Sequence, residues 1–151
     1  MDGRCEYLDE DFFMYKDDVD LSWRARLAGW SIAYNPQCLA WHQRGSGQSA
    51  ARSMGAILAE RRAIGTLAKY HSWKNARLLQ IKNDLAIHLL RDLPWWLAKE
   101  VASWLYVLVA EPTTVPAIGQ TLRLLPRAFT KRRRVMAKRR VSTRDIGKWF
   151  E

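Results

Sequence analysis

The sequence has few of the features that stabilise a secreted scaffold or a membrane span. Two cysteines, Cys5 and Cys38, are too few for a disulfide framework and lack metal-ligand spacing, which favours a reduced, cytosolic setting. The start, MDGRCEYLDED, is acidic and has no apolar leader. The charge-free apolar run at residues 101–110 is about half of the roughly 20 residues that cross a bilayer, and Lys99 and Glu100 precede it. We therefore predict no transmembrane helix.

Charge is distributed unevenly along the 151 residues. Residues 1–51 contain five Lys and Arg against eight Asp and Glu, whereas residues 52–151 contain twenty against seven, and the whole chain carries +10. Six of the acidic side chains lie within residues 9–26. This asymmetry indicates two functional regions, of which the basic one faces an anionic partner such as an acidic membrane surface or a nucleic acid.

The first third of the chain predicts mixed α and β structure. Asp17 or Asp18 is placed to cap a helix that runs to Ala28, and Gly29 ends it. Two short segments that follow are rich in aromatic and β-branched residues and are typical of strands: residues 30–34 and residues 38–42. A two-stranded sheet is marginal by itself, so this piece is expected to be the end of a larger domain.

After about Ala50 the pattern becomes helical. An apolar stripe predicts one helix over residues 54–70, and a second is expected over residues 73–91. Pro94 is suited to open a third helix that runs to about Ala110. Pro112 and Pro116 then break the chain, and further helical turns reach Arg140.

Residues 8–47 carry a composite motif. LDEDFF is an aromatic, acidic loop; DDVD opens a helix that ends in Arg and Gly; a strand and a histidine before RGS follow. This combination resembles the C-terminal part of the catalytic domain of family 2 glycosyltransferases, especially bacterial rhamnosyltransferase-like members. The helical remainder resembles their C-terminal extensions more loosely.

The resemblance implies a fold and a reaction. The expected fold class is an α/β remnant of a GT-A, Rossmann-like domain at residues 1–49, followed by a basic helical extension at residues 50–151, mostly α overall. Such enzymes transfer a sugar from a nucleotide-diphosphate donor to an acceptor hydroxyl, with inversion, in cell-surface polysaccharide or glycolipid synthesis. A divalent cation, Mg or Mn, stabilises the leaving diphosphate. The Asp-x-Asp motif that binds this cation and the donor-binding half of the domain are absent from this sequence, so the chain is expected to be a fragment that is inactive alone.

The motif match assigns the general base to Asp18. A carboxylate at a helix N-terminus is favoured in its ionised form, which a base requires. Asp17 stands where the family more often has Glu, and Asp20 is expected to organise the site or the helix start. The alternative for Asp17 and Asp18 is simple helix capping, which does not exclude catalysis.

Other residues of the motif receive expected roles by position. Glu10, Asp11 and Phe13 are assigned to the acceptor pocket, although packing in the core is the simpler interpretation of the aromatic residue. His42 and Arg44 are candidates for contacts to the diphosphate or its metal, or else a structural imidazole and a solvated arginine. Two tryptophans of the motif, Trp30 and Trp41, are expected in the core.

The helical region has features of a membrane-surface protein. Residues 93–112 combine Trp95, Trp96 and Trp104 with aliphatic residues, and aromatic side chains favour the membrane interface. Residues 131–140 contain seven Lys and Arg, among them Arg132, Arg133 and Arg134. Peripheral attachment to the inner face of the plasma membrane would bring the enzyme to a glycan or lipid-linked acceptor. Packing of the aromatic helix on the domain, with a solvated basic face, is the alternative, as is a non-catalytic membrane-surface or adaptor protein. No nucleic-acid motif is present, so no nucleic-acid partner is expected.

Overall fold

The computed structural model describes residues 7–39, 41 and 53–148. These residues are mostly helical and form no strand, which confirms the expectation of a mostly α protein. Their elements, in chain order, are α1 (Asp17–Leu27), α2 (Met54–Ala63), α3 (Thr66–Asn83), α4 (Ala86–Arg91), α5 (Leu93–Ala110), the 3₁₀ turn η1 (Pro112–Thr114), α6 (Pro116–Ala137) and α7 (Thr143–Gly147).

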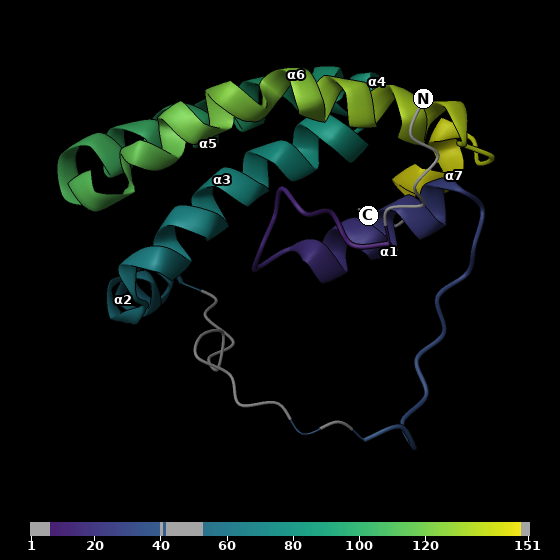
Figure 1. The fold of residues 1–151 in the computed structure, drawn as a ribbon, viewed down its shortest axis with the longest axis horizontal. Coiled ribbons are helices and arrows are strands. Elements are labelled where there is room, and N and C mark those ends of the chain that lie inside the picture. Colours follow the sequence, from purple (N-terminus) through teal and green to yellow (C-terminus); the bar gives the residue numbers. More distant parts are fainter. Residues whose placement is uncertain (1–6, 40, 42–52, 149–151) are drawn as a thin grey trace.

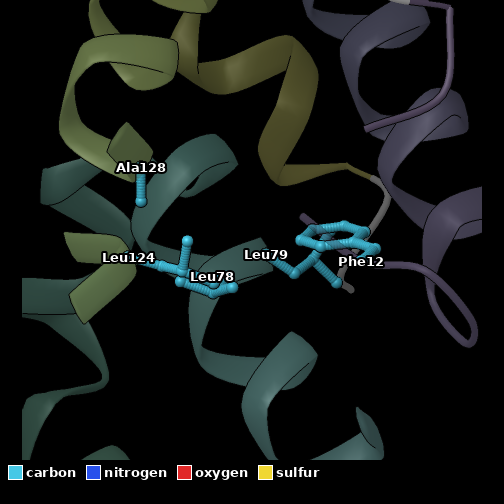
Figure 2. Close-up of a cluster of buried hydrophobic side chains, with 5 residues drawn as sticks. All are labelled: Phe12, Leu78, Leu79, Leu124 and Ala128. Carbon is cyan, nitrogen blue, oxygen red and sulfur yellow. The ribbon is translucent and has the colours of Figure 1, made fainter. Parts of the chain in front are cut away.

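Helices α3 and α6 form the centre of the fold, and α1 packs against both of them (Figure 1). The main hydrophobic cluster joins the loop before α1 to this pair. Phe12 contributes the largest side chain, and Leu78 and Leu79 of α3 meet Leu124 and Ala128 of α6 around it (Figure 2). Burial of these apolar side chains is the main stabilising contribution to the contact between the acidic segment and the helices.

Two smaller clusters hold the outer elements. Leu27 at the end of α1 packs with Leu85 and with Ile146 of α7. Trp73 of α3 packs with Val107 of α5 and Ala117 of α6, and this cluster is the main apolar anchor of α5.

Helix α1 ends as its sequence predicts. Gly29 adopts a φ of 88°, its N–H donates to the carbonyl of Arg26, and the N–H of Trp30 donates to the carbonyl of Ala25. These two bonds form a Schellman motif, which favours glycine because a side chain is strained at positive φ. The start of the helix differs from the expectation that Asp17 or Asp18 caps it. Lys16 occupies the N-cap in the left-handed region, with no side-chain cap bond.

The later helices are shorter than the apolar stripe indicates. The helix expected over residues 54–70 breaks at Ile64 and Gly65, whose backbones are extended. The one expected over residues 73–91 breaks at Asp84 and Leu85 for the same reason. The helical spacing of apolar residues continues in the sequence through both breaks, because only two extended residues separate the helices at each break. The sequence pattern therefore does not reveal where one helix ends and the next begins. The third helix is confirmed, with Pro94 in its first turn.

The two predicted strands do not form. Residues 30–34 have no regular structure, and neither do Cys38, Leu39 and Trp41, the described part of the segment 38–42. The described residues after Trp30, up to residue 39, loop away from the helices (Figure 1). Trp30 and Trp41, expected in the core, are 73% and 98% exposed. Strand propensity needs a neighbouring strand to pair with, and the described residues supply none.

Candidate functional site

A buried ion-pair network takes up three carboxylates of the acidic segment. Asp20 of α1 is fully buried, and its Oδ1 lies 2.7 Å from the Lys82 ammonium. Lys82 also binds Asp9, and the side-chain amide of Asn83 donates to Asp20 at 2.7 Å. Arg24 reaches the second oxygen of Asp20 at 2.8 Å. Such a pair is stable in a core only when its remaining polar atoms are also bonded, as they are here.

The helix α6 adds a second lysine to this network. Lys131 binds Asp9 and lies 2.8 Å from Asp11, and Arg127 lies 3.2 Å from Asp11. Burial alone would raise the pKa of the Asp9 carboxyl, but hydrogen bonds from Lys131 and Lys82 outweigh burial and leave this pKa below its usual value. Asp9 is therefore a structural anion that ties the N-terminal segment to α3 and α6.

These contacts explain why a basic chain has an acidic segment. The inner faces of α3 and α6 carry cations, and the acids of the segment pair with them. Asp11, assigned to the acceptor pocket from sequence, is largely buried among these cations, and its carbonyl accepts a bond from Lys74. Asp20, expected to organise the helix start, anchors α1 to α3. Glu10, also assigned to the acceptor pocket, is exposed.

The loop between Phe12 and α1 has a strained backbone. Phe13, Tyr15 and Lys16 have φ values of 59°, 64° and 66°, a region that non-glycine residues rarely adopt. The buried amide of Asn75 on α3 holds the loop by donating to the carbonyls of Phe12, Met14 and Tyr15, at 2.6 to 2.9 Å. Such strain persists only where the surroundings enforce it, and it is concentrated at functional sites.

Phe13 and the first acids of α1 lie on the outside of this loop. The Phe13 ring is 77% exposed, with its centroid 5.2 Å from that of His71. Asp17 is half-buried and Asp18 is exposed. The carboxylate of Asp18 accepts a bond from the N–H of Val19 at 2.8 Å. The structure therefore presents Asp18 to solvent in the first turn of α1.

His42 and Arg44 lie outside the described residues. No cluster of three or more His, Cys, Asp or Glu side chains suited to a metal ion occurs within the described ranges.

Helix α5 leaves most of its apolar surface uncovered. Val107 is its buried residue, whereas Trp95, Leu105 and Val109 are exposed, Val109 to 82%. A cleft of about 750 Å³ opens between α3, α4, α5 and α6, lined mainly by aliphatic and aromatic side chains. This amount of exposed apolar surface on one element is typical of an interaction site.

The three tryptophans assigned to the membrane differ in their surroundings. Trp95 is exposed, and Trp96 is half-buried, with its indole N–H 3.4 Å from Gln80. The Trp104 ring packs edge-on against Trp73, with 5.1 Å between their centroids. Trp104 therefore anchors α5 to α3, and Trp95 is the one that points outward.

The three arginines of the basic run also differ in their surroundings. Arg132 donates to the carbonyls of Ile81 and Asp84 at 2.8 and 2.6 Å, and so caps the end of α3. Arg133 and Arg134 are exposed. Within the described residues no single helix is long and apolar enough to cross a bilayer, although α5 and residues 112–137, bent by 111°, pass together by length and composition.

Sequence reasoning missed the residues of α3 that organise this site. Lys74, Leu78 and Lys82 recur every four residues, as do Asn75, Leu79 and Asn83. Polar residues that share a helix face with buried apolar residues indicate polar partners in the core, because a polar group that is buried without a partner destabilises the fold. This spacing on α3 is the sequence pattern from which the buried ion-pair network could have been predicted.

No protein-family model, no curated protein and no solved structure matches this chain.

Proposed function

We propose that the chain is the acceptor-side part of a glycosyltransferase, which moves a sugar from a nucleotide-diphosphate donor to a hydroxyl with Asp18 as general base. One observation carries this proposal. Asp9, Asp11 and Asp20 are bound by lysines and arginines, whereas Asp18 is presented to solvent at the start of α1. The acidic segment thus separates structural carboxylates from one that is available for chemistry.

The loop before α1 supports the proposed role of Asp18. A sugar hydroxyl is a weak nucleophile, and a carboxylate within hydrogen-bond reach accepts its proton as the oxygen attacks. Precise placement of such a base is worth a large part of the rate. Asn75 provides this placement by fixing the strained backbone at Tyr15, two residues before α1 begins.

The exposed segment after α1 fits the same proposal. Residues 30–34 present Trp30, Ile32 and Tyr34 to solvent, a pattern that suits a strand once a neighbouring strand is supplied. We propose that the donor-binding half of the domain supplies this neighbour, so that residues 1–49 complete an α/β sheet. The divalent cation of the reaction would stabilise the leaving diphosphate. We assign no step to it, because the described residues offer no ligand set for it.

The test of this function is sugar transfer in cells that carry the gene at its own locus. We expect Asp18→Asn to leave the folded chain at normal abundance and to lower transfer by about 10²- to 10⁴-fold, the usual contribution of general-base catalysis. Asp92→Asn is the matched control, because Asp92 is an exposed aspartate elsewhere in the chain that pairs with its neighbour Arg91. Near-normal transfer by the Asp18→Asn variant would remove Asp18 from the proposed role.

A second candidate function, attachment to an anionic membrane surface, is favoured by α5. Its exposed apolar side chains suit the interface of a leaflet, and the exposed Arg133 on α6 suits anionic headgroups. The proposed location is the inner face of the plasma membrane, next to a glycan or lipid-linked acceptor. A non-catalytic membrane-surface protein would share this property without the chemistry of Asp18.

Sedimentation with vesicles tests the membrane proposal. We expect the chain to pellet with phosphatidylserine vesicles more than with neutral ones, and less as salt rises. Val109→Glu on α5 should reduce binding several-fold, whereas Leu67→Glu, at an exposed apolar position on α3, should leave it unchanged. Equal loss in both variants, or binding to duplex DNA in place of vesicles, would contradict it.

A further inference from the structure

A second cleft, of about 670 Å³, lies between α1 and α6 and has a cationic wall. Five of its lining residues are basic, and none of those that line it within the described ranges is acidic. The basic residues are Arg24, Lys82, Lys131, Arg134 and Lys138. A concave surface with charge of one sign concentrates ligands of the opposite sign.

Two of these cations are not used by the fold. Arg24, Lys82 and Lys131 belong to the network around Asp9 and Asp20. Arg134 and Lys138 are exposed, and their side chains form no ion pair or hydrogen bond with any residue that the structure describes. Their charges are therefore available to a ligand.

The spacing of the cations on α6 places them together. Lys131, Arg134 and Lys138 lie three and four residues apart, so they share one face of the helix, and this face lines the cleft. Like charges at this spacing repel each other. A ligand with two or more negative charges removes this repulsion, and Arg134 offers a guanidinium that binds two phosphate oxygens at once.

Aromatic side chains also contribute to the lining of this cleft. Tyr7 and Trp30 both line the cleft, and both are exposed. The Schellman motif at Gly29 fixes the backbone of Trp30, and Arg24 donates to the carbonyl of Tyr7 at 2.6 Å. An exposed ring on a fixed backbone suits a flat ligand, because stacking of two rings stabilises the complex beyond the contribution of the apolar area that it buries.

The cleft begins about one helical turn from the proposed base. Leu21, Ala25 and Ala28 line it from α1, and the same helical stripe reaches Asp18 one turn before Leu21.

We propose that this cleft binds a diphosphate ester, with Arg134 and Lys138 on the phosphate oxygens and the attached ring on Trp30. The two exposed cations suit the negative charge of a diphosphate, and Trp30 suits the ring of its sugar or base. The identity of the ligand as a sugar or nucleoside diphosphate rests on the proposed function, whereas the phosphate chemistry rests on the cleft itself.

Calorimetric titration of the full chain with uridine diphosphate and with inorganic pyrophosphate tests the proposal without any transfer reaction. We expect both probes to bind at low salt, and uridine diphosphate to bind more tightly because its ring reaches Trp30. Arg134→Ala with Lys138→Ala should weaken both probes at least tenfold. Trp30→Ala should remove the preference for uridine diphosphate and leave the affinity for pyrophosphate unchanged.

The matched control is Arg133→Ala with Arg139→Ala, which removes the same charge from exposed arginines that do not line the cleft. It should change affinity less than twofold, and thermal unfolding should show all variants folded. Absence of binding, or equal weakening by both double variants, would overturn the proposal. Vesicles of phosphatidylserine separate the two sources of phosphate: if they alone bind through Arg134 and Lys138, the cleft holds a lipid headgroup and the soluble ester is excluded. Because no sugar is transferred, failure here leaves the role of Asp18 standing.

Discussion

The ammonium of Lys82 on α3 lies 2.7 Å from the carboxylate of Asp20 on α1, and both side chains are buried. This contact joins residues 62 positions apart in the sequence and ties α1 to the central pair of helices. It also explains the concentration of acids in a basic chain, because Asp9, Asp11 and Asp20 supply the anions that pair with Lys82 of α3 and Lys131 of α6.

Lys82→Met should therefore destabilise the fold strongly. Removing one partner of a buried ion pair leaves an uncompensated carboxylate, and we expect the free energy of unfolding in urea to fall by about 3 kcal/mol. Lys148→Met is the control, because Lys148 is exposed and lies 3.7 Å from Asp145. Its loss should cost less than about 0.5 kcal/mol. Similar costs for both variants would show that the buried network is not what holds α1.

Acid should weaken the protein through Asp9. Burial opposes ionisation of this carboxyl, but Lys131 and Lys82 outweigh burial, so its pKa is lower in the folded protein than the value of about 3.9 in an unfolded chain. The folded state then binds fewer protons than the unfolded state. The stability that this provides is complete above about pH 4 and is lost as the pH falls through the folded pKa.

The pKa of Asp84 is shifted in the opposite direction, so this residue serves as the comparison. Burial raises its pKa, so it contributes stability at low pH that is lost as pH rises through its folded pKa. In urea unfolding between pH 5 and pH 2, Asp9→Asn should make the loss of stability on acidification shallower. Asp84→Asn should make it steeper. The same slope in both variants would contradict this account.

The sequence predicted some elements because their signals are local. Gly29 ends α1 and Pro94 opens α5 through backbone preferences that depend on the residue itself. The prediction of a strand at residues 30–34 was wrong, because a strand forms only where a second strand is present to pair with it. The ion pairs of Asp11 and Asp20 could not be predicted from sequence, because they depend on the packing of α3 and α6, which brings Lys82 and Lys131 close together.

The site could be predicted only in part. Exposure of Asp18 agrees with what a base requires, but the N-cap at Lys16 and the strain of the loop have no signal in the sequence. Positive φ at Phe13, Tyr15 and Lys16 is enforced by Asn75, about 60 residues away. Local preference opposes this conformation, so no local rule predicts it.

Asn75→Leu tests whether this side chain enforces the loop. The change keeps the branched heavy-atom skeleton and leaves the carbonyls of Phe12, Met14 and Tyr15 without their donor, which should cost about 1–3 kcal/mol in urea unfolding. The loop should then open locally, and tryptic cleavage after Lys16 should accelerate about tenfold. Asn35→Ala, in an exposed turn, should change neither measurement. Unchanged cleavage in Asn75→Leu would mean that packing of Phe12 alone holds the loop.

Substitution of two glycines by alanine should give effects of opposite sign. Gly29 sits at a φ of 88°, where alanine costs about 1–2 kcal/mol of backbone strain. A Cβ there would lie 3.5 Å from the Cβ of Arg140, an ordinary contact, so the cost comes from the backbone rather than from a clash. Gly119 is an exposed residue within α6, and a Cβ there would meet nothing within 4 Å. Gly119→Ala should raise stability by about 0.5–1 kcal/mol through better helix propensity.

Thermal and urea unfolding of the two variants, Gly29→Ala and Gly119→Ala, measure this contrast directly. Gly29→Ala should also weaken the binding of uridine diphosphate in the α1–α6 cleft, because the Schellman bond to Trp30 positions that ring. Pyrophosphate, which needs only Arg134 and Lys138, should bind to this variant as it does to the wild type. Loss of both ligands would mean that Gly29→Ala disturbs α1 as a whole, and loss of neither would mean that the ring of Trp30 takes no part in binding.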